Sequence, residues 1–124
     1  MQMDFYGFAD GAFHHTLNLA SAAWVLYSPA EYLVSSGAVC IGLATNNIVE
    51  YEAVIGLLTE AASQDVCDLV VLMDSQLVVC HLNHVYTIRN PMLLCLTYRH
   101  IPMEYNVFAD SLANYILYWH ISHS

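Results

Sequence analysis

Four of the eleven acidic residues occupy positions at which a folded chain would bring carboxylates together. Asp10 ends an alternating apolar and polar stretch, and Asp74 directly follows a short aliphatic run. Open α/β sheets commonly place their sites where strands end, so we expect these two acids at one sheet edge. Glu50 falls in the first turn of a predicted helix, on its apolar stripe, and Asp110 opens the last predicted helix with Ala113 and Leu117 spaced behind it. We therefore expect all four carboxylates to converge.

Converging carboxylates indicate a site for hard metal ions. Four such groups repel one another, which raises their pKa values unless cations neutralise them. Oxygen ligands alone favour Mg²⁺ or Mn²⁺, and two such ions held a few ångströms apart are the recurrent machinery of phosphodiester cleavage. The sequence thus predicts a site for two divalent ions.

Each acid also has an ordinary structural interpretation. Asn47 with Glu50 three residues later matches a capping box, and Asp110 would favour a helix N-terminus electrostatically. Asp10 could occupy a turn, and Asp74 could cap a helix that starts near residue 75. The joint pattern favours the metal site over four separate coincidences.

The elements that must position these residues follow from hydrophobic periodicity. Alternation predicts a first strand, a break at 28–30 predicts a hairpin, and helical spacing predicts a long helix after Asn46 and Asn47. The last helix is expected to be capped by Asn106. The predicted strands are 3–10, 22–27, 32–41, 69–73 and 97–101, and the predicted helices are 48–62, 75–82 and 107–120. Three successive strands followed by strand and helix alternation indicate a mixed α/β sheet.

Length, composition and charge limit the classes of protein to which this chain can belong. A chain of 124 residues that is 58% hydrophobic is sized for one domain, 1–124, and no apolar run is long enough to span a membrane. The N-terminus lacks a secretory signal, so we expect an intracellular protein, cytoplasmic or nuclear, and not a secreted one. The cysteines are expected to be buried free thiols: Cys40, Cys67, Cys80 and Cys95. The net charge of −9, with two arginines and no lysine, is the wrong sign for tight nucleic-acid binding.

Four motifs together resemble the ribonuclease H family, most closely its reverse-transcriptase-like branch found in plant proteins and retrotransposon polyproteins. The motifs are FADGA around Asp10, ATNNIVEYEAVIGLL around Glu50, LVVLMDSQLVV around Asp74 and HIPMEYNVFADSLANYIL around Asp110. They follow one another in order along nearly the whole chain.

The resemblance implies an RNase H-like fold, a mixed five-stranded sheet flanked by helices. It also implies Mg²⁺-dependent endonucleolytic hydrolysis of the RNA strand of an RNA–DNA hybrid, with release of a 3′-hydroxyl. The same resemblance assigns catalysis and metal binding to Asp10, Glu50, Asp74 and Asp110. It assigns substrate contacts to Gly11, Asn46, Asn47, Ser75, Gln76 and Asn106.

The sequence departs from the family pattern in three places. Hydrophobic and histidine residues 13–17 replace a polar turn, and Met103 replaces the usual arginine of the last motif. Only 110 − 74 = 36 positions separate Asp74 from Asp110, which predicts that a helix after Pro91 is truncated. That cut would expose the aliphatic helix 75–82 unless a second copy or another protein covers it. An alternative function is therefore a domesticated or decayed retroelement domain that acts through protein contacts.

Histidines and aromatic residues offer weaker signals. His81 with His84, and His120 with His123, have a spacing compatible with zinc, but no nearby glutamate or cysteine completes either pair. Three rings near the C-terminus could stack on bases, but helical spacing favours a place in the core: Tyr115, Tyr118 and Trp119.

Overall fold

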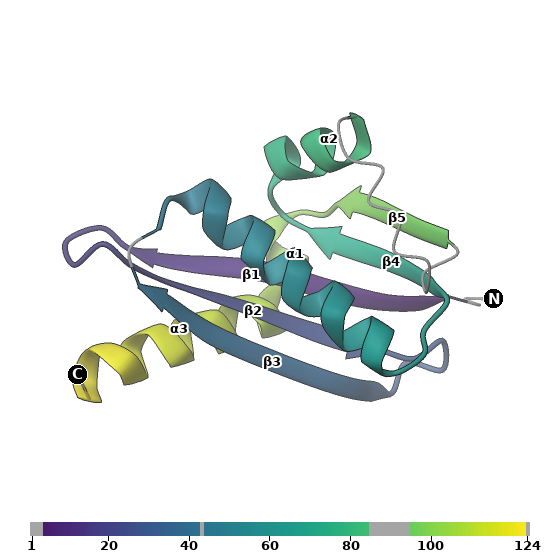
Figure 1. Cartoon of the computed structure of the whole chain (residues 1–124), viewed down its shortest axis with the longest axis horizontal. Coiled ribbons are helices and arrows are strands. Elements are labelled where there is room, and N and C mark those ends of the chain that lie inside the picture. The colour runs from purple at the N-terminus through teal and green to yellow at the C-terminus, as the bar shows by residue number, and fades with distance from the viewer. Residues whose placement is uncertain (1–3, 43, 85–94, 124) are drawn as a thin grey trace.

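A mixed five-stranded sheet forms the centre of the molecule (Figure 1). The computed structural model describes residues 4–42, 44–84 and 95–123. The strand order is β3-β2-β1-β4-β5; β2 runs antiparallel to its neighbours β1 and β3, and β4 and β5 run parallel to β1. The strands are β1 (Phe5–His14), β2 (Leu19–Tyr27), β3 (Leu33–Gly42), β4 (Asp68–Met73) and β5 (Cys95–His100). The predicted fold class is confirmed.

Helices cover both faces of this sheet (Figure 1). Helix α1 (Asn46–Ser63) packs across β1, β2 and β3, and α2 (Gln76–His84) lies beside it against β5. Helix α3 (Val107–His123) covers the opposite face, after a short 3₁₀ turn η1 (Met103–Tyr105). Among the described residues no helix is both long and apolar enough to cross a membrane.

Two hydrophobic clusters hold these layers together. The larger lies between the sheet and the α1–α2 side, and alternate β2 residues such as Ala20 and Ala22 contribute to it. The smaller lies under α3, where Ala12, Ala23 and Ala113 pack together with Leu117. Three of these four side chains are alanines, so α3 approaches the sheet closely enough for the Ser21 hydroxyl of β2 to donate to the backbone oxygen of Ala113.

The first strand does not end where the sequence suggested. We expected Asp10 to end it, but β1 continues to His14 and pairs with β2 from Tyr6 opposite Tyr27 to His14 opposite Leu19. Asp10 is therefore a buried acid inside β1, where it pairs with Ala23 of β2. The parallel pairing with β4 does stop nearby, at Phe8 opposite Leu72.

Both helix starts beside the expected site also differ from the prediction. Helix α1 begins at Asn46, and the side chain of Thr45 accepts a hydrogen bond from the backbone N–H of Ile48. The cap is thus Thr45 rather than Asn47, and Glu50 lies in the second turn. At α2 the hydroxyl of Ser75, and not Asp74, accepts from the N–H of Val78.

Several burial predictions are wrong. Tyr115, Tyr118 and Trp119 are exposed, because they lie on the face of α3 that points away from the sheet. Cys67 and Cys80 are exposed free thiols rather than buried ones, and Cys40 is a half-buried free thiol.

The shortened region can be compared with the structure only in part. Helix α2 buries its aliphatic side chains Val78, Val79 and Leu82 and exposes only Leu77 among its described leucines and valines, so the expected exposed face is small. The predicted truncated helix after Pro91 lies outside the described residues, apart from Cys95 and Leu96, which belong to β5.

Candidate metal centre

The ends of β4 and of the parallel part of β1 bring two aspartates together. The last paired residues of β1 and β4 are Phe8 and Leu72. Asp10 and Asp74 each lie two residues further along their chain segments, so they lie next to each other. Glu50 reaches the same point from α1, and one carboxylate oxygen from each of these three acids lies within 4.8 Å of the others. The convergence that the sequence predicted is present for these three.

Gly11 makes this approach possible. A methyl group at this position would lie 2.2 Å from Cγ1 of Val49 and 3.2 Å from Oε1 of Glu50. Its backbone N–H also donates to Oδ1 of Asp10 at 2.9 Å. The glycine therefore lets α1 pack directly on β1 with Glu50 over the strand.

Asp110 joins the group from α3. Its carboxyl hydrogen-bonds to that of Asp10. Asn114, one turn further along the helix, donates through Nδ2 to the carboxyl Oδ1 of Asp110 at 3.3 Å and to its backbone oxygen at 2.9 Å. Asp110 lies in the first turn of α3, so the electrostatic interpretation of this residue remains compatible with the structure.

Burial and mutual repulsion change the acidity of the cluster. Desolvation, followed by the charges of Asp74 and Glu50, raises the pKa of Asp10 to about 9. Burial and the charge of Asp74 raise the pKa of Glu50 to about 7. Burial also raises the pKa of Asp74, although hydrogen bonding from Asn106 and the nearby His100 act in the opposite direction. Without cations, the cluster therefore holds protons near neutral pH.

These residues fit a hard divalent cation. All candidate ligands are carboxylate oxygens, and among the described residues Oε2 of Glu50 is a buried oxygen with no hydrogen-bond partner. An uncompensated buried carboxylate is costly, and a cation would satisfy it. The donor set matches the preferences of Mg²⁺ and Mn²⁺.

The residues with predicted substrate contacts do not form one cluster as the carboxylates do, and they differ in exposure. Asn47 and Gln76 are exposed at the starts of α1 and α2, and half-buried Ser75 caps α2. Asn46 is the first residue of α1. Gly11 lies in β1 under Glu50.

Asn106 is fully buried and makes contacts within the protein. Its Nδ2 donates to the backbone oxygen of Ala9 at 3.1 Å, and its side chain hydrogen-bonds to Asp74. Among the described residues, Oδ1 has no partner, so the side chain does not cap α3 as expected. Asn106 thus connects the start of α3 to β1 and to the carboxylate cluster.

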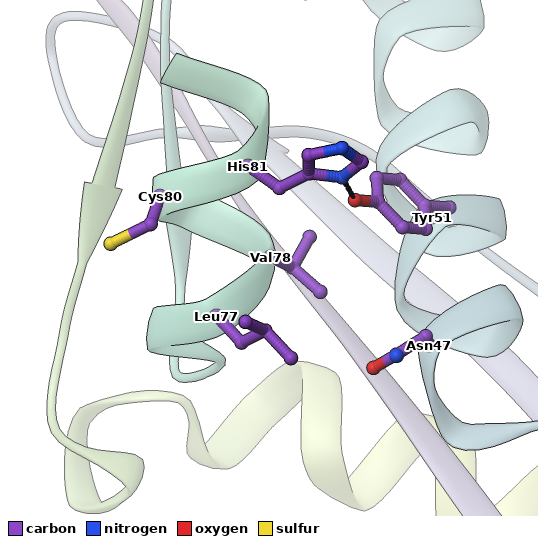
Figure 2. Close-up of a pocket in the computed structure, with 6 residues that line it drawn as sticks. All are labelled: Asn47, Tyr51, Leu77, Val78, Cys80 and His81. Carbon is purple, nitrogen blue, oxygen red and sulfur yellow. Dashed lines mark hydrogen bonds between the residues drawn. The ribbon is translucent and has the colours of Figure 1, made fainter. Parts of the chain in front are cut away.

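A pocket next to the cluster was not predicted from the sequence (Figure 2). It has a volume of about 440 Å³ and lies between α1 and α2. Tyr51 and His81 point toward one another from the two helices and share a hydrogen bond between the hydroxyl and Nδ1. Its lining residues are Asn47, Tyr51, Leu77, Val78, Cys80 and His81. Asn47 precedes Glu50 by one helical turn, and Leu77 follows Asp74 by three residues, so the pocket adjoins the carboxylates.

Comparisons with known proteins agree with this architecture. A family model described as reverse transcriptase-like matches residues 8–116. Ribonuclease HI of Halobacterium salinarum is 33% identical over 123 residues, which cover 88% of this chain and 62% of that protein. The chain therefore spans less than two thirds of the length of that relative.

Solved structures show the same fold. The crystal structure of RNase H1 from Halobacterium salinarum NRC-1 has a TM-score of 0.82 and 31% identity, with 92% of this chain and 97% of that chain covered. LC11-RNase H1, solved in complex with an RNA/DNA hybrid, has a TM-score of 0.82 and 25% identity, with 95% and 99% covered.

Proposed function

We propose that this chain, which belongs to the reverse transcriptase-like family, hydrolyses the RNA strand of RNA–DNA hybrids at its carboxylate cluster. The observation that carries the proposal is the convergence of Asp10, Glu50 and Asp74, with their ligand oxygens within 4.8 Å. The names of the relatives support the reaction, because one is a ribonuclease HI and another was solved with a hybrid.

The proposed site would hold two divalent ions, Mg²⁺ or Mn²⁺, on the carboxylates of Asp10, Glu50, Asp74 and Asp110. Bound there, the ions would supply positive charge that activates a water molecule and stabilises the leaving oxygen. Glu50 and Asp10 would lose their protons on loading, since the ligands must be ionised. Asn106 would keep Asp74 oriented toward the site.

The proposed substrate position follows from the two helix starts. Asn47 and Gln76 are exposed next to the cluster, and the pocket of Figure 2 continues from Asn47 toward His81. A hybrid whose scissile phosphate lies on the carboxylates would contact these exposed residues. We also propose that Gly11, Asn46 and Ser75 help to shape this surface.

Cleavage of an end-labelled hybrid tests the function. Cutting should require Mg²⁺ or Mn²⁺ and should fall at least about 100-fold in Asp74→Asn, because one ligand charge is lost. Asp68→Asn is the matched control, since Asp68 is an exposed acid at the start of the same strand and should leave the rate unchanged. No cutting at high protein concentration and low salt would contradict the proposal.

The second candidate is a domesticated or decayed domain that acts through protein contacts. The net charge of −9 with only two arginines favours it, because phosphate attraction must be small. This candidate predicts negligible affinity for the hybrid in Ca²⁺, whereas a working nuclease should bind the hybrid measurably under the same conditions.

A further inference from the structure

The solvent face of α3 carries an aromatic surface with no role in the proposed cleavage. Its rings are well exposed: Phe108 is 48% exposed, Tyr115 64%, Tyr118 59% and Trp119 51%. Ser111 and Ser122 lie on the same face and are exposed as well. We call these six residues the α3 stripe: Phe108, Ser111, Tyr115, Tyr118, Trp119 and Ser122.

The α3 stripe is uncharged in a chain that is otherwise acidic. Asp110 is the only Asp, Glu, Lys or Arg between positions 107 and 123, and it lies on the inward side with the carboxylate cluster. Aromatic surfaces that bind nucleic acid combine their rings with basic residues that follow the phosphates. The α3 stripe has no lysine or arginine; the ring of His123 stacks on Trp119, but one imidazole cannot follow a phosphate backbone, so the chemistry of the stripe fits a protein surface.

The size of the stripe is sufficient for a modest interface. Four aromatic side chains at these exposures present on the order of 400–500 Å² of surface. The two serines and the half-buried Leu112 and Ile116 at the margins bring one helix face to roughly 600 Å². Two copies would thus bury roughly 1,200 Å², which is the lower end of the range for specific complexes.

The order of residues along the stripe makes it complementary to itself. Tyr115 lies midway between Phe108 and Ser122, which are about 21 Å apart along the helix axis. If two α3 helices cross antiparallel at Tyr115, Phe108 of one copy faces Ser122 of the other. In the same arrangement Ser111 faces Trp119, so a small side chain meets a large one at each of these four contacts.

We propose that the α3 stripe is the contact between two copies of this chain, related by a twofold axis through the Tyr115 positions. A twofold contact uses the same surface on both partners, as this pattern requires. Association should strengthen as salt screens the repulsion between two copies of charge −9.

Sedimentation of the full chain over a range of concentrations tests this proposal. We expect a monomer–dimer equilibrium that shifts toward dimer with added NaCl. Tyr115→Glu should give a monomer at every concentration, because it buries two like charges at the axis. Tyr32→Glu is the matched control: Tyr32 is 73% exposed, lies between β2 and β3, and should leave the equilibrium unchanged. Circular dichroism and thermal melting check that each variant is folded.

An exchange of side chains tests the register. Trp119→Ser alone should weaken the dimer by loss of a ring, and Ser111→Trp alone should weaken it by a clash. The double variant places Trp opposite Ser again and should recover at least half of the lost association free energy. The proposal would be overturned if the native chain were monomeric or if the dimer survived Tyr115→Glu. It would also be overturned if the losses of association free energy from the two single substitutions simply added in the double variant. A monomer in which Tyr115→Glu lowers hybrid affinity would overturn it too, and would mark the stripe as a nucleic-acid surface.

Discussion

Folding strongly raises the pKa of the Asp10 carboxyl, and the causes of the rise are visible in the structure. In the metal-free chain its pKa is raised from 3.8 to about 9, mainly by burial and then by Asp74 and Glu50. Between these two pH values the folded chain keeps a proton that the unfolded chain has lost. The folded state therefore binds more protons, and stability must fall as the pH rises through this window.

A neutral substitution at Asp10 should remove this pH dependence. We expect Asp10→Asn to raise the metal-free melting temperature at pH 8 by roughly 5 °C, with a smaller gain at pH 5. Added Mg²⁺ should stabilise the native chain more than the variant, because the variant lacks one ligand charge. Differential scanning calorimetry with and without EDTA measures both effects, with Asp68→Asn as the control. An unchanged melting temperature at pH 8 would show that burial and the neighbouring charges do not raise the pKa of Asp10.

Asn106 differs from the other residues with predicted substrate contacts because it is fully buried. Asn106→Ala removes donors to the Ala9 carbonyl and to Asp74, so we expect a loss of about 2 kcal/mol of stability. We also expect weaker Mg²⁺ binding and a lower kcat, with little change in KM for the hybrid. Gln76→Ala, at an exposed position, should instead raise KM without a loss of stability. Steady-state kinetics with a metal titration separate the two, and a pure KM effect in Asn106→Ala would favour direct substrate contact.

At the scale of elements, the approach of α1 to β1 depends on Gly11. In Gly11→Ala the new methyl meets Cγ1 of Val49, so α1 must shift at a cost of about 1–3 kcal/mol and Glu50 must move with it. We expect a loss of cleavage larger than the loss of stability would explain. Val49→Ala removes the colliding atom, and the double variant should regain stability relative to Gly11→Ala. Urea unfolding of the four proteins measures this, and simple additivity would mean that the contact is not the cause.

The elements themselves could be predicted from hydrophobic spacing, but their ends and outward faces could not. Asp10 suggests the end of a strand because an acid is rare inside one, and only the pairing with β2 shows that the strand continues. Thr45 and Asn47 are both good helix caps, so spacing alone could not choose between them. Apolar residues surround α3 on all sides, and which side faces the sheet depends on tertiary packing. For that reason helical spacing predicts a core position for Tyr115, although its side chain is exposed.

The candidate site was more predictable than these ends. Asp10 lies in β1, Glu50 lies in α1 and Asp74 follows β4, and the relative positions of these elements are fixed by the parallel pairing of β1 with β4 and by the packing of α1 on β1. The pocket beside them depends on the contact between Tyr51 and His81, which are thirty positions apart. No local pattern signals such a pair. The catalytic role of the acids stays a prediction until cleavage is measured.

At the scale of the whole molecule, charge sets how a hybrid can bind. The chain has two arginines and no lysine, and the described one, Arg99, is exposed on β5. Each phosphate neutralised by a basic residue contributes a slope of about −0.9 to the plot of log K against log salt. We therefore expect a slope no steeper than about −2 at a fixed concentration of divalent ion.

Fluorescence anisotropy of a labelled hybrid at pH 8, in Ca²⁺ and increasing NaCl, measures this slope. Arg99→Ala should reduce the slope by about 1 if Arg99 contacts a phosphate, and should leave it unchanged if it does not. Removing Ca²⁺ should abolish binding in either case, because the carboxylate cluster then presents negative charge to the backbone. A slope near −6, or tight binding in EDTA, would show that the hybrid is held by groups other than these. The affinity of this acidic chain for a hybrid should thus depend on divalent ions far more than on its own basic residues.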